Sequence, residues 1–304
     1  MRTFVLKKIP GFKLLAAGIV FFSLTVFTII ASCTVVPQER MFATGNSSMD
    51  VYRDSGNCEQ RIERKSDLSL SPDNISILNW NIYKGSRDDW KNDLTRLLGK
   101  KDILLLQEAP LTDELLEILE ENRMRWNFNG TFTFKGQETG VLSASQVVPI
   151  ESCGFRVAEP ILRLPKAATI SKYRIKDSDQ TLLVGNIHGI NFTLGQAAYK
   201  NQMTTMAEVL KDHDGPVILA GDFNNWSQKR IETVKELAAT IGLKPLEFRN
   251  ENRTKILGRS VDHIYYRGVE PVELESHPID SSDHNPLTVT FKLTRLQTGA
   301  LTAN

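Results

Sequence analysis

The stretch that decides the fold is Pro216-Val-Ile-Leu-Ala-Gly-Asp-Phe-Asn-Asn-Trp226. Its apolar residues from Val217 to Ala220 predict a short buried strand, and Gly221 ends that strand. Asp222 and Asn224 follow at positions i and i+2, and side chains two apart at a strand end point to the same side. A carboxylate beside a carboxamide suits a metal-bound water or a phosphate oxygen. For this stretch alone, an Asx-rich turn without a ligand is the alternative.

Polar side chains also stand where other predicted strands end. They are Asn81, Gln107, Glu108, Asn186, His188, Asp262, Asp283 and His284. A strand needs no such residue at its end, and a buried carboxylate is costly unless it is paired or bound to a metal. If these ends converge, the site offers carboxylates, imidazoles and amides, a set that suits Mg²⁺ or Mn²⁺. No cysteine has the spacing of a structural zinc site.

Strands and helices alternate from residue 75 onward. The pattern predicts strands over 75–82, 102–108, 126–134, 139–144, 167–175, 181–187, 217–220, 260–266 and 287–293, and helices over 88–98, 112–121, 195–213 and 228–241. The strands between 126 and 187 are expected to be antiparallel. No linker divides this region, so we expect one α/β domain with packed sheets over 74–294 and a loose tail over 295–304.

The composition of the 304-residue chain, 41% hydrophobic and 24% charged, is ordinary for a soluble globular protein. The formal charge is +1, but the first 33 residues carry four basic residues and no acid. The remainder has 33 basic and 36 acidic residues, a formal charge of −3. This balance lacks the basic excess that is typical of a non-specific nucleic-acid binder.

The first 33 residues have the pattern of a membrane-directing segment. A basic head precedes an uncharged run of 20 residues from Leu14 to Cys33, which is long enough to span a bilayer. The run ends in Ile30-Ala-Ser-Cys33, which resembles a bacterial lipobox. We therefore expect residues 1–33 to be an inner-membrane anchor or a lipoprotein signal, with the domain in the periplasm. A cytoplasmic protein with a buried apolar helix is the alternative.

Residues 34–73 are polar and are predicted to form a linker with at most one short helix. Cys58 and Cys153 remain if Cys33 is lipidated, and outside the cytoplasm they could form a disulfide. Two unpaired thiols are the alternative.

Six motifs in chain order resemble those of the endonuclease/exonuclease/phosphatase superfamily, which has the DNase I-like fold. They are Trp80-Asn81-Ile82, Gln107-Glu108, Asn186-Ile-His188, Gly221-Asp222-Phe-Asn224, Val261-Asp262-His-Ile-Tyr265 and Ser282-Asp283-His284-Asn-Pro286. Two longer stretches, Glu159-Pro-Ile-Leu-Arg163 and 186–195, are similar to the bacterial YafD-type branch. The resemblance implies a four-layer αββα sandwich with its site where the two sheets open at one edge.

The resemblance also implies a metal site and a water-activating pair. Glu108 would be the main Mg²⁺ ligand, with Asn81 and Asp283 beside it. His284 would be the general base or would hold the attacking water. Asp262 would accept the other ring N–H of His284, as in other hydrolytic sites.

Three further residues receive roles from the same resemblance. Asp222 would orient or deprotonate the nucleophile. Asn224 would bind a phosphate oxygen, and His188 would donate to a phosphate oxygen or to the leaving group. Lys166 is either a further phosphate contact or a solvated charge.

These features predict a Mg²⁺-dependent hydrolase of phosphodiesters or phosphomonoesters. The expected partners are a phosphate-ester substrate (nucleic acid, phospholipid head group or small phosphodiester) and the membrane, with no obligate protein partner. A non-specific DNA endonuclease and a non-catalytic binding module are the alternatives. The complete set of candidate site residues favours an enzyme over the binding module.

Overall fold

The computed structural model describes residues 34–37, 42–45, 49–52, 58, 62–161, 163–193, 195–249 and 251–294. The predicted anchor or signal over 1–33 and the tail over 295–304 lie outside these residues. Among the helices in the described part of the chain, none is long and apolar enough to cross a bilayer.

Most of the strands belong to two large sheets. The first sheet contains β1 (Thr34–Val35), β2 (Phe42–Gly45), β3 (Met49–Tyr52), β5 (Ile75–Asn81), β6 (Ile103–Pro110), β7 (Arg125–Phe134), β8 (Gln137–Ser145), β17 (Val269–Ser276) and β18 (Leu287–Leu293). The second contains β4 (Ile62–Glu63), β9 (Glu151–Ala158), β10 (Pro165–Arg174), β11 (Thr181–His188), β12 (Val217–Asp222), β13 (Lys244–Pro245) and β16 (Asp262–Arg267). The remaining elements are the hairpin of β14 (Lys255–Ile256) and β15 (Arg259–Ser260), the 3₁₀ helix η1 (Tyr83–Gly85), and the helices α2 (Trp90–Leu98), α3 (Asp113–Glu121), α4 (Ala197–Lys211) and α5 (Gln228–Thr240).

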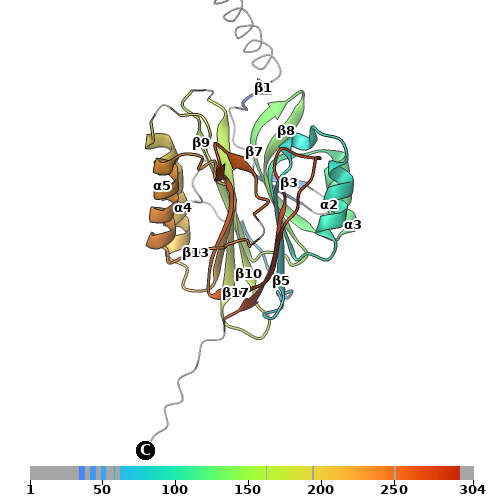
Figure 1. The fold of residues 1–304 in the computed structure, drawn as a ribbon. Helices are drawn as coiled ribbons and strands as arrows, with labels where there is room; N and C mark the ends of the chain where they lie inside the picture. Colours follow the sequence, from blue (N-terminus) through green and yellow to red (C-terminus); the bar gives the residue numbers. More distant parts are fainter. Residues whose placement is uncertain are drawn as a thin grey trace, which may run out of the picture.

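The two sheets face each other, and a pair of helices covers each outer surface (Figure 1). The strand order is β17-β18-β5-β6-β8-β7-β2-β3 in the first sheet, with β1 beside β7, and β13-β16-β12-β11-β10-β9-β4 in the second. Helices α2 and α3 pack on the first sheet, and α4 and α5 pack on the second. This arrangement confirms the predicted four-layer αββα sandwich. The four predicted helices are all present.

Two of the longer strands of the sandwich were not predicted from the sequence. β17 lies at the edge of its sheet and carries exposed side chains along much of its length, so it lacks a clear apolar row. β9 contains Gly154, and glycine weakens a strand signal. This glycine is required by packing, because a Cβ atom there would stand 2.6 Å from Nδ2 of Asn129 and 2.9 Å from the carbonyl oxygen of Ala168.

Four described segments of residues 34–73 are strands of the two sheets. β1 and β2 pair with β7, β3 pairs with β2, and β4 pairs with β9. The prediction of a linker over this stretch is therefore wrong for these four segments. The prediction failed because the stretch as a whole is polar and each of these strands has only two or four residues, too few to show an apolar row.

Cys58 and Cys153 form a disulfide across 95 residues of sequence. The sequence left a disulfide and two free thiols as alternatives, and the structure shows the disulfide. The bond ties the segment before β4 to the middle of β9, and both cysteines lie in the apolar cluster beneath α4 and α5. It therefore links the amino-terminal strands to the body of the second sheet.

We expect Cys58→Ser to lower the free energy of unfolding by about 2–4 kcal/mol, because a long loop of the unfolded chain is no longer closed. The measurement is urea unfolding of the full chain in detergent, followed by circular dichroism. Wild-type protein in reductant should fall to the stability of the variant, and the variant should not respond to reductant. A wild-type stability that is unchanged by complete reduction would contradict this account.

Candidate active site

The inward-facing side chains of four strands change from apolar to polar along each strand. Because alternate residues of a strand share one face, each row can be followed by steps of two. The rows are Ile75, Ile77, Asn79 and Asn81 on β5; Ile103, Leu105 and Gln107 on β6; Leu182, Val184, Asn186 and His188 on β11; and Ile218, Ala220 and Asp222 on β12. The apolar ends form the cluster between the sheets. The polar ends therefore meet at one end of the sandwich, where the site lies.

Buried amides form the floor of this site and join the two sheets. Nε2 of Gln107 donates to Oδ1 of Asn79 at 3.0 Å and, across the sandwich, to Oδ1 of Asn186 at 2.6 Å. Nδ2 of Asn186 donates in turn to the carbonyl oxygens of Leu106 and Leu142. Gln107 and Asn186 thus align the two sheets with each other below the charged groups.

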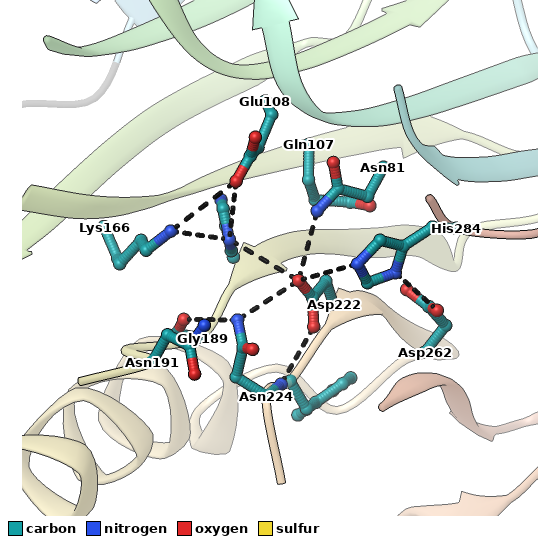
Figure 2. A network of polar contacts seen from close by, with 12 residues as sticks. Asn81, Gln107, Glu108, Lys166, Gly189, Asn191, Asp222, Asn224, Asp262 and His284 are labelled. Carbon is teal, nitrogen blue, oxygen red and sulfur yellow. Dashed lines mark hydrogen bonds and ion pairs between the residues drawn. The ribbon is translucent and has the colours of Figure 1, made fainter. Parts of the chain in front are cut away.

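Asp222 is the centre of the polar cluster (Figure 2). Its side chain is buried, and Oδ2 accepts hydrogen bonds from Nδ2 of Asn81 and Nδ2 of Asn224, each at 3.1 Å. Oδ2 also lies 3.5 Å from Nε2 of His188 and 3.9 Å from Nε2 of His284. Burial raises the pKa of Asp222 to about 6, although the positive charge of His284 acts in the opposite direction. Asp222 is therefore poised to exchange a proton near neutral pH.

Asn224 holds Asp222 in place. Its backbone N–H donates to Oδ1 of Asp222 at 2.9 Å, and its Nδ2 donates to Oδ2 of Asp222 and to the carbonyl oxygen of Gly189 at 3.0 Å. A carboxamide has only two N–H groups, and both are engaged here. In this arrangement Asn224 positions a carboxylate and has no free N–H for a phosphate oxygen.

His284 and Asp262 form a buried pair. Nδ1 of His284 donates to Oδ2 of Asp262 at 2.8 Å, and both side chains are almost completely shielded from water. Burial alone would lower the pKa of His284, but the negative charges of Asp262 and Asp222 raise it to about 10. The imidazole is thus protonated at neutral pH, with its Nε2–H on the side of Asp222.

Glu108 is placed by an irregularity in the first sheet. The register between β6 and β8 shifts between Leu106 and Ala109, and Glu108 has a φ of +49°. A bulge of this kind redirects a side chain, and a left-handed backbone conformation in a glutamate carries strain. Its carboxylate contacts the ammonium of Lys84 and lies 3.8 Å from that of Lys166.

The two ammonium groups determine the charge state of Glu108. Burial alone would raise its pKa, but the charges of Lys166 and Lys84 lower it to about 2. The carboxylate is therefore ionised throughout the physiological range. Sequence reasoning missed Lys84, although one signal was present. It stands three residues after Asn81, in a Lys84-Gly85 pair that ends the strand.

His188 contacts Lys166 through a single short hydrogen bond, with Nε2 2.9 Å from Nζ. An ammonium group can only donate, so Nε2 of His188 accepts. Burial and the charge of Lys166 lower the pKa of His188 well below its usual value, so the ring is neutral. In this arrangement Lys166, rather than Nε2 of His188, carries the hydrogens that can be donated to a phosphate oxygen.

Asp283 lies beside His284 in a loop that is fixed to β5. The hydroxyl of Ser282 donates to the carbonyl oxygen of Asn81 at 2.7 Å, and Nε1 of Trp80 donates to the carbonyl oxygen of His284 at 2.9 Å. Burial raises the pKa of Asp283. These contacts bring the loop before β18 to the end of β5.

Arg230 is a supporting residue that sequence reasoning missed. It is buried, and Nη1 donates to the carbonyl oxygens of Ile190 and Asn224 at 2.7 Å each. Its guanidinium lies 4.5 Å from the ring centroids of Trp226 and Tyr199. Asn224 has a φ of +48°, and the hydrogen bond from Arg230 helps to hold this conformation. In the sequence Arg230 is an ordinary charge on an amphipathic helix.

Two groups of residues have the chemistry to bind a divalent cation. Glu108 and Asp283 are close enough for the charge of Glu108 to raise the pKa of Asp283, and Asn81 lies at the neighbouring strand end. Carboxylate and amide oxygens of this kind suit Mg²⁺ or Mn²⁺. Asp222, Asp262 and His284 form the second group, with one ligand atom from each residue within 4.8 Å of the others.

The fold and the site together define a DNase I-like hydrolase of phosphate esters. The model of the Endonuclease/Exonuclease/phosphatase family matches residues 78–284. The chain therefore belongs to this family, which confirms the resemblance seen in the motifs.

Relatives and solved structures agree with this assignment. A UPF0294 protein of Vibrio campbellii is 38% identical over 284 residues, which cover 93% of this chain and 99% of that protein. A UPF0294 protein of Photorhabdus laumondii is 36% identical over 224 residues, which cover 74% and 86% of the two chains. The human Nocturnin catalytic domain with bound sulfate superposes with a TM-score of 0.61 at 17% identity, covering 75% of this chain and 96% of that domain. ANGEL2, described as a 2′,3′-cyclic phosphatase, gives a TM-score of 0.55 at 15% identity, covering 76% of this chain and 98% of that one.

We expect Asp262→Asn to move the pKa of His284 from about 10 toward its ordinary value, because the largest favourable charge is removed. Because folding raises the pKa of His284, the protonated ring stabilises the folded state. This stabilisation is complete below the unfolded pKa of about 6.5 and is lost as the pH rises through about 10. The stability difference between wild type and variant should therefore be larger at pH 6 than above pH 10.

The pKa itself is measured by NMR titration of the histidine ring signals in metal-free protein with a chelator present. His284→Gln identifies the signal. An unchanged midpoint in Asp262→Asn would refute the pairing.

Proposed function

We propose that this chain is a Mg²⁺-dependent hydrolase of phosphodiesters or phosphomonoesters, with Mn²⁺ as an alternative metal. Glu108 is the main ligand, and Asn81 and Asp283 complete the protein's share of the site. The bound cation would supply positive charge to the phosphoryl oxygens. The observation that carries the proposal is the convergence of an ionised Glu108 and the Asp262–His284 pair at one end of two packed sheets.

The pKa directions favour a role for His284 that differs from the two expected from the resemblance, that of a proton donor. A histidine whose pKa is about 10 is already protonated at neutral pH, so it is a poor base and a good donor. Asp222, with a pKa of about 6, is ionised at neutral pH and able to accept the proton of the attacking water. We therefore assign proton abstraction to Asp222. His284 donates through Nε2 to a phosphoryl oxygen.

Charge neutralisation is the second task of the site. Lys166 is buried and borders both Glu108 and His188, and Lys84 contacts Glu108 from the other side. Phosphoryl transfer places negative charge on the equatorial oxygens, where ammonium donors in a water-poor site act most strongly. Lys166 is the buried donor that we assign to these oxygens.

Two observations support the proposed location in the periplasm, with the domain held at the inner membrane. The Cys58–Cys153 disulfide is typical of an oxidising compartment outside the cytoplasm. The sequence of residues 1–33 has the basic head and apolar run of an anchor or a lipoprotein signal. We therefore use the full chain in the experiments below, since residues 34–73 supply sheet strands and Cys58.

We expect both Glu108→Ala and His284→Ala to reduce Mg²⁺-dependent hydrolysis of bis-p-nitrophenyl phosphate by about 10²-fold or more. Metal binding separates their roles. Glu108→Ala should weaken Mn²⁺ binding, measured by electron paramagnetic resonance, by about tenfold or more, whereas His284→Ala should change it less than about twofold. His213→Gln, which lies outside the site against the carbonyl oxygen of Thr181, is the matched control. Equal loss of metal binding in the two site variants would contradict the assigned roles.

Lys166→Met should weaken inhibition by inorganic phosphate about tenfold, because one charge-assisted hydrogen bond to the anion is lost. Lys200→Met removes an exposed lysine that pairs with Glu236 at 3.5 Å, and it should leave the inhibition constant unchanged. The constants are measured with the full chain at fixed Mg²⁺ and fixed ionic strength. Equal inhibition constants for wild type and Lys166→Met would remove Lys166 from the anion site.

A further inference from the structure

The end of the molecule that carries the site also carries most of the exposed apolar side chains. Among the described residues, eight large apolar side chains are exposed. Six of them lie on segments at the end of the sandwich that carries the site, and they are called the rim residues here: Val35, Val36, Tyr83, Ile161, Phe192 and Leu257. The other two, Leu68 and Val272, lie on other parts of the surface. Single exposed apolar residues are ordinary, but several at one end of a molecule favour an interaction surface at that end.

Two rim residues lie on loops that are joined beside the site. Phe192, half exposed at 52%, stands three residues after Gly189, whose carbonyl oxygen accepts from Asn224. Oε1 of Glu159 accepts from the backbone N–H groups of Asn191 and Phe192 at 2.7 and 3.3 Å. Ile161, 50% exposed, follows Glu159 by two residues. A buried carboxylate thus holds both apolar side chains at the same border.

Leu257 lies on the opposite border of the site. It forms the tip of the β14–β15 hairpin and is 74% exposed. The hairpin leads directly into Asp262, and its base is fixed to the loop after His284 by a 2.8 Å hydrogen bond from the backbone N–H of Asn285 to Oγ1 of Thr254. An exposed leucine at a hairpin tip has no role in the core of the domain.

The amino-terminal strand lies at the same end of the sandwich. Val35 pairs with Thr133 on β7, beyond the point where Gly140 of β8 pairs with Ala109. Ala109 follows Glu108, so β1 lies past the site in the direction in which β6 runs. Figure 1 shows β1 at this end of the molecule. The predicted apolar run ends at Cys33, immediately before β1, so an anchored chain holds this end toward the bilayer.

Exposed basic residues stand among the rim residues. Lys135 lies at the turn between β7 and β8, Arg163 follows Ile161 by two residues, and Lys255 and Arg259 flank Leu257. Apolar side chains beside lysine and arginine are the combination that binds an anionic lipid surface.

We propose that the rim residues form a bilayer-docking surface and that the substrate is the phosphodiester head group of a membrane phospholipid. This inference rests on the proposed function, because the same site carries out the reaction. The oxygen of a water molecule bonds to phosphorus, and one P–O ester bond breaks. One proton of the water passes to Asp222, and the leaving alkoxide takes up a proton to become an alcohol. The products are a phosphate monoester and that alcohol, one of which stays in the bilayer.

The activity test uses the full chain in vesicles of phosphatidylethanolamine and phosphatidylglycerol. The rim variant is Ile161→Ser/Phe192→Ser/Leu257→Ser, and the matched control is Leu68→Ser/Val272→Ser. We expect the rim variant to lose about tenfold or more of its hydrolysis of vesicle phospholipid. Its rate on the water-soluble bis-p-nitrophenyl phosphate should change less than about twofold, because no catalytic group is altered. The control should match wild type on both substrates.

A second measurement reports docking without activity. Phe192→Trp and Val272→Trp are each placed in vesicles that contain a brominated phospholipid, which quenches nearby tryptophan fluorescence. The four native tryptophans are common to both variants. A difference in quenching between the variants therefore reports whether the added tryptophan contacts lipid. We expect the quenched fraction of tryptophan fluorescence to exceed that of the wild-type protein in Phe192→Trp but not in Val272→Trp.

The outcomes separate this inference from the proposed function. Wild-type protein that is inactive on both substrates would count against the proposed hydrolase, while the quenching result still decides whether the rim docks. Equal quenching in the two tryptophan variants, or a rim variant that keeps its vesicle activity, would overturn the docking surface. A dimer of wild-type protein that becomes a monomer in the rim variant, measured by light scattering in detergent, would also overturn it in favour of contact between two copies of this chain.

Discussion

The structure of the site depends on keeping one buried carboxylate, that of Asp222, in a fixed position. A carboxylate away from water is unfavourable unless donors surround it. Asn81 supplies one donor from the first sheet, and Asn224 supplies two from the loop after β12. The hydrogen bond from Asn81 to Oδ2 of Asp222 therefore joins the two sheets. The hydrogen bond between Gln107 and Asn186 joins them again below it. The contacts that compensate the buried charge are the contacts that bring the strand ends together.

The need to surround a buried carboxylate with donors also explains why the inward-facing side chains of β5, β6, β11 and β12 change from apolar to polar along each strand. The cluster between the sheets holds the sandwich together at the end remote from the site, where Ile77, Leu105 and Ile218 are fully buried. Hydrophobic burial is non-directional, so it sets how far apart the sheets lie but not their precise alignment. The directional Gln107–Asn186 hydrogen bond supplies that alignment directly below the charged groups. Apolar burial at one end of the strands thus stabilises the sandwich, and directional hydrogen bonds at the other end set the geometry of the site.

The sequence predicted those parts of the structure that depend on residue patterns within one element. The strand before Asp222, the four helices and the polar strand ends were all visible in this way, and so was a possible disulfide. What it could not reveal are contacts that only the tertiary fold creates. Lys84 reaches Glu108 because η1 follows β5, and Arg230 reaches the loop at Asn224 because α5 packs there. Short edge strands such as β4 were missed because main-chain pairing leaves little trace in composition.

Three residues in or beside the site have a strained backbone conformation. Glu108, Lys84 and Asn224 have φ values of +49°, +60° and +48°, and a non-glycine residue in this region costs on the order of 1–3 kcal/mol. Such conformations persist only where the surroundings determine them completely. The bulge in β6 does so for Glu108, and the hydrogen bonds of Arg230 and Asp222 do so for Asn224. The backbone at Glu108 and at Asn224, which holds Asp222, is thus fixed by the fold itself, so under the proposed function less binding free energy would be needed to order these residues.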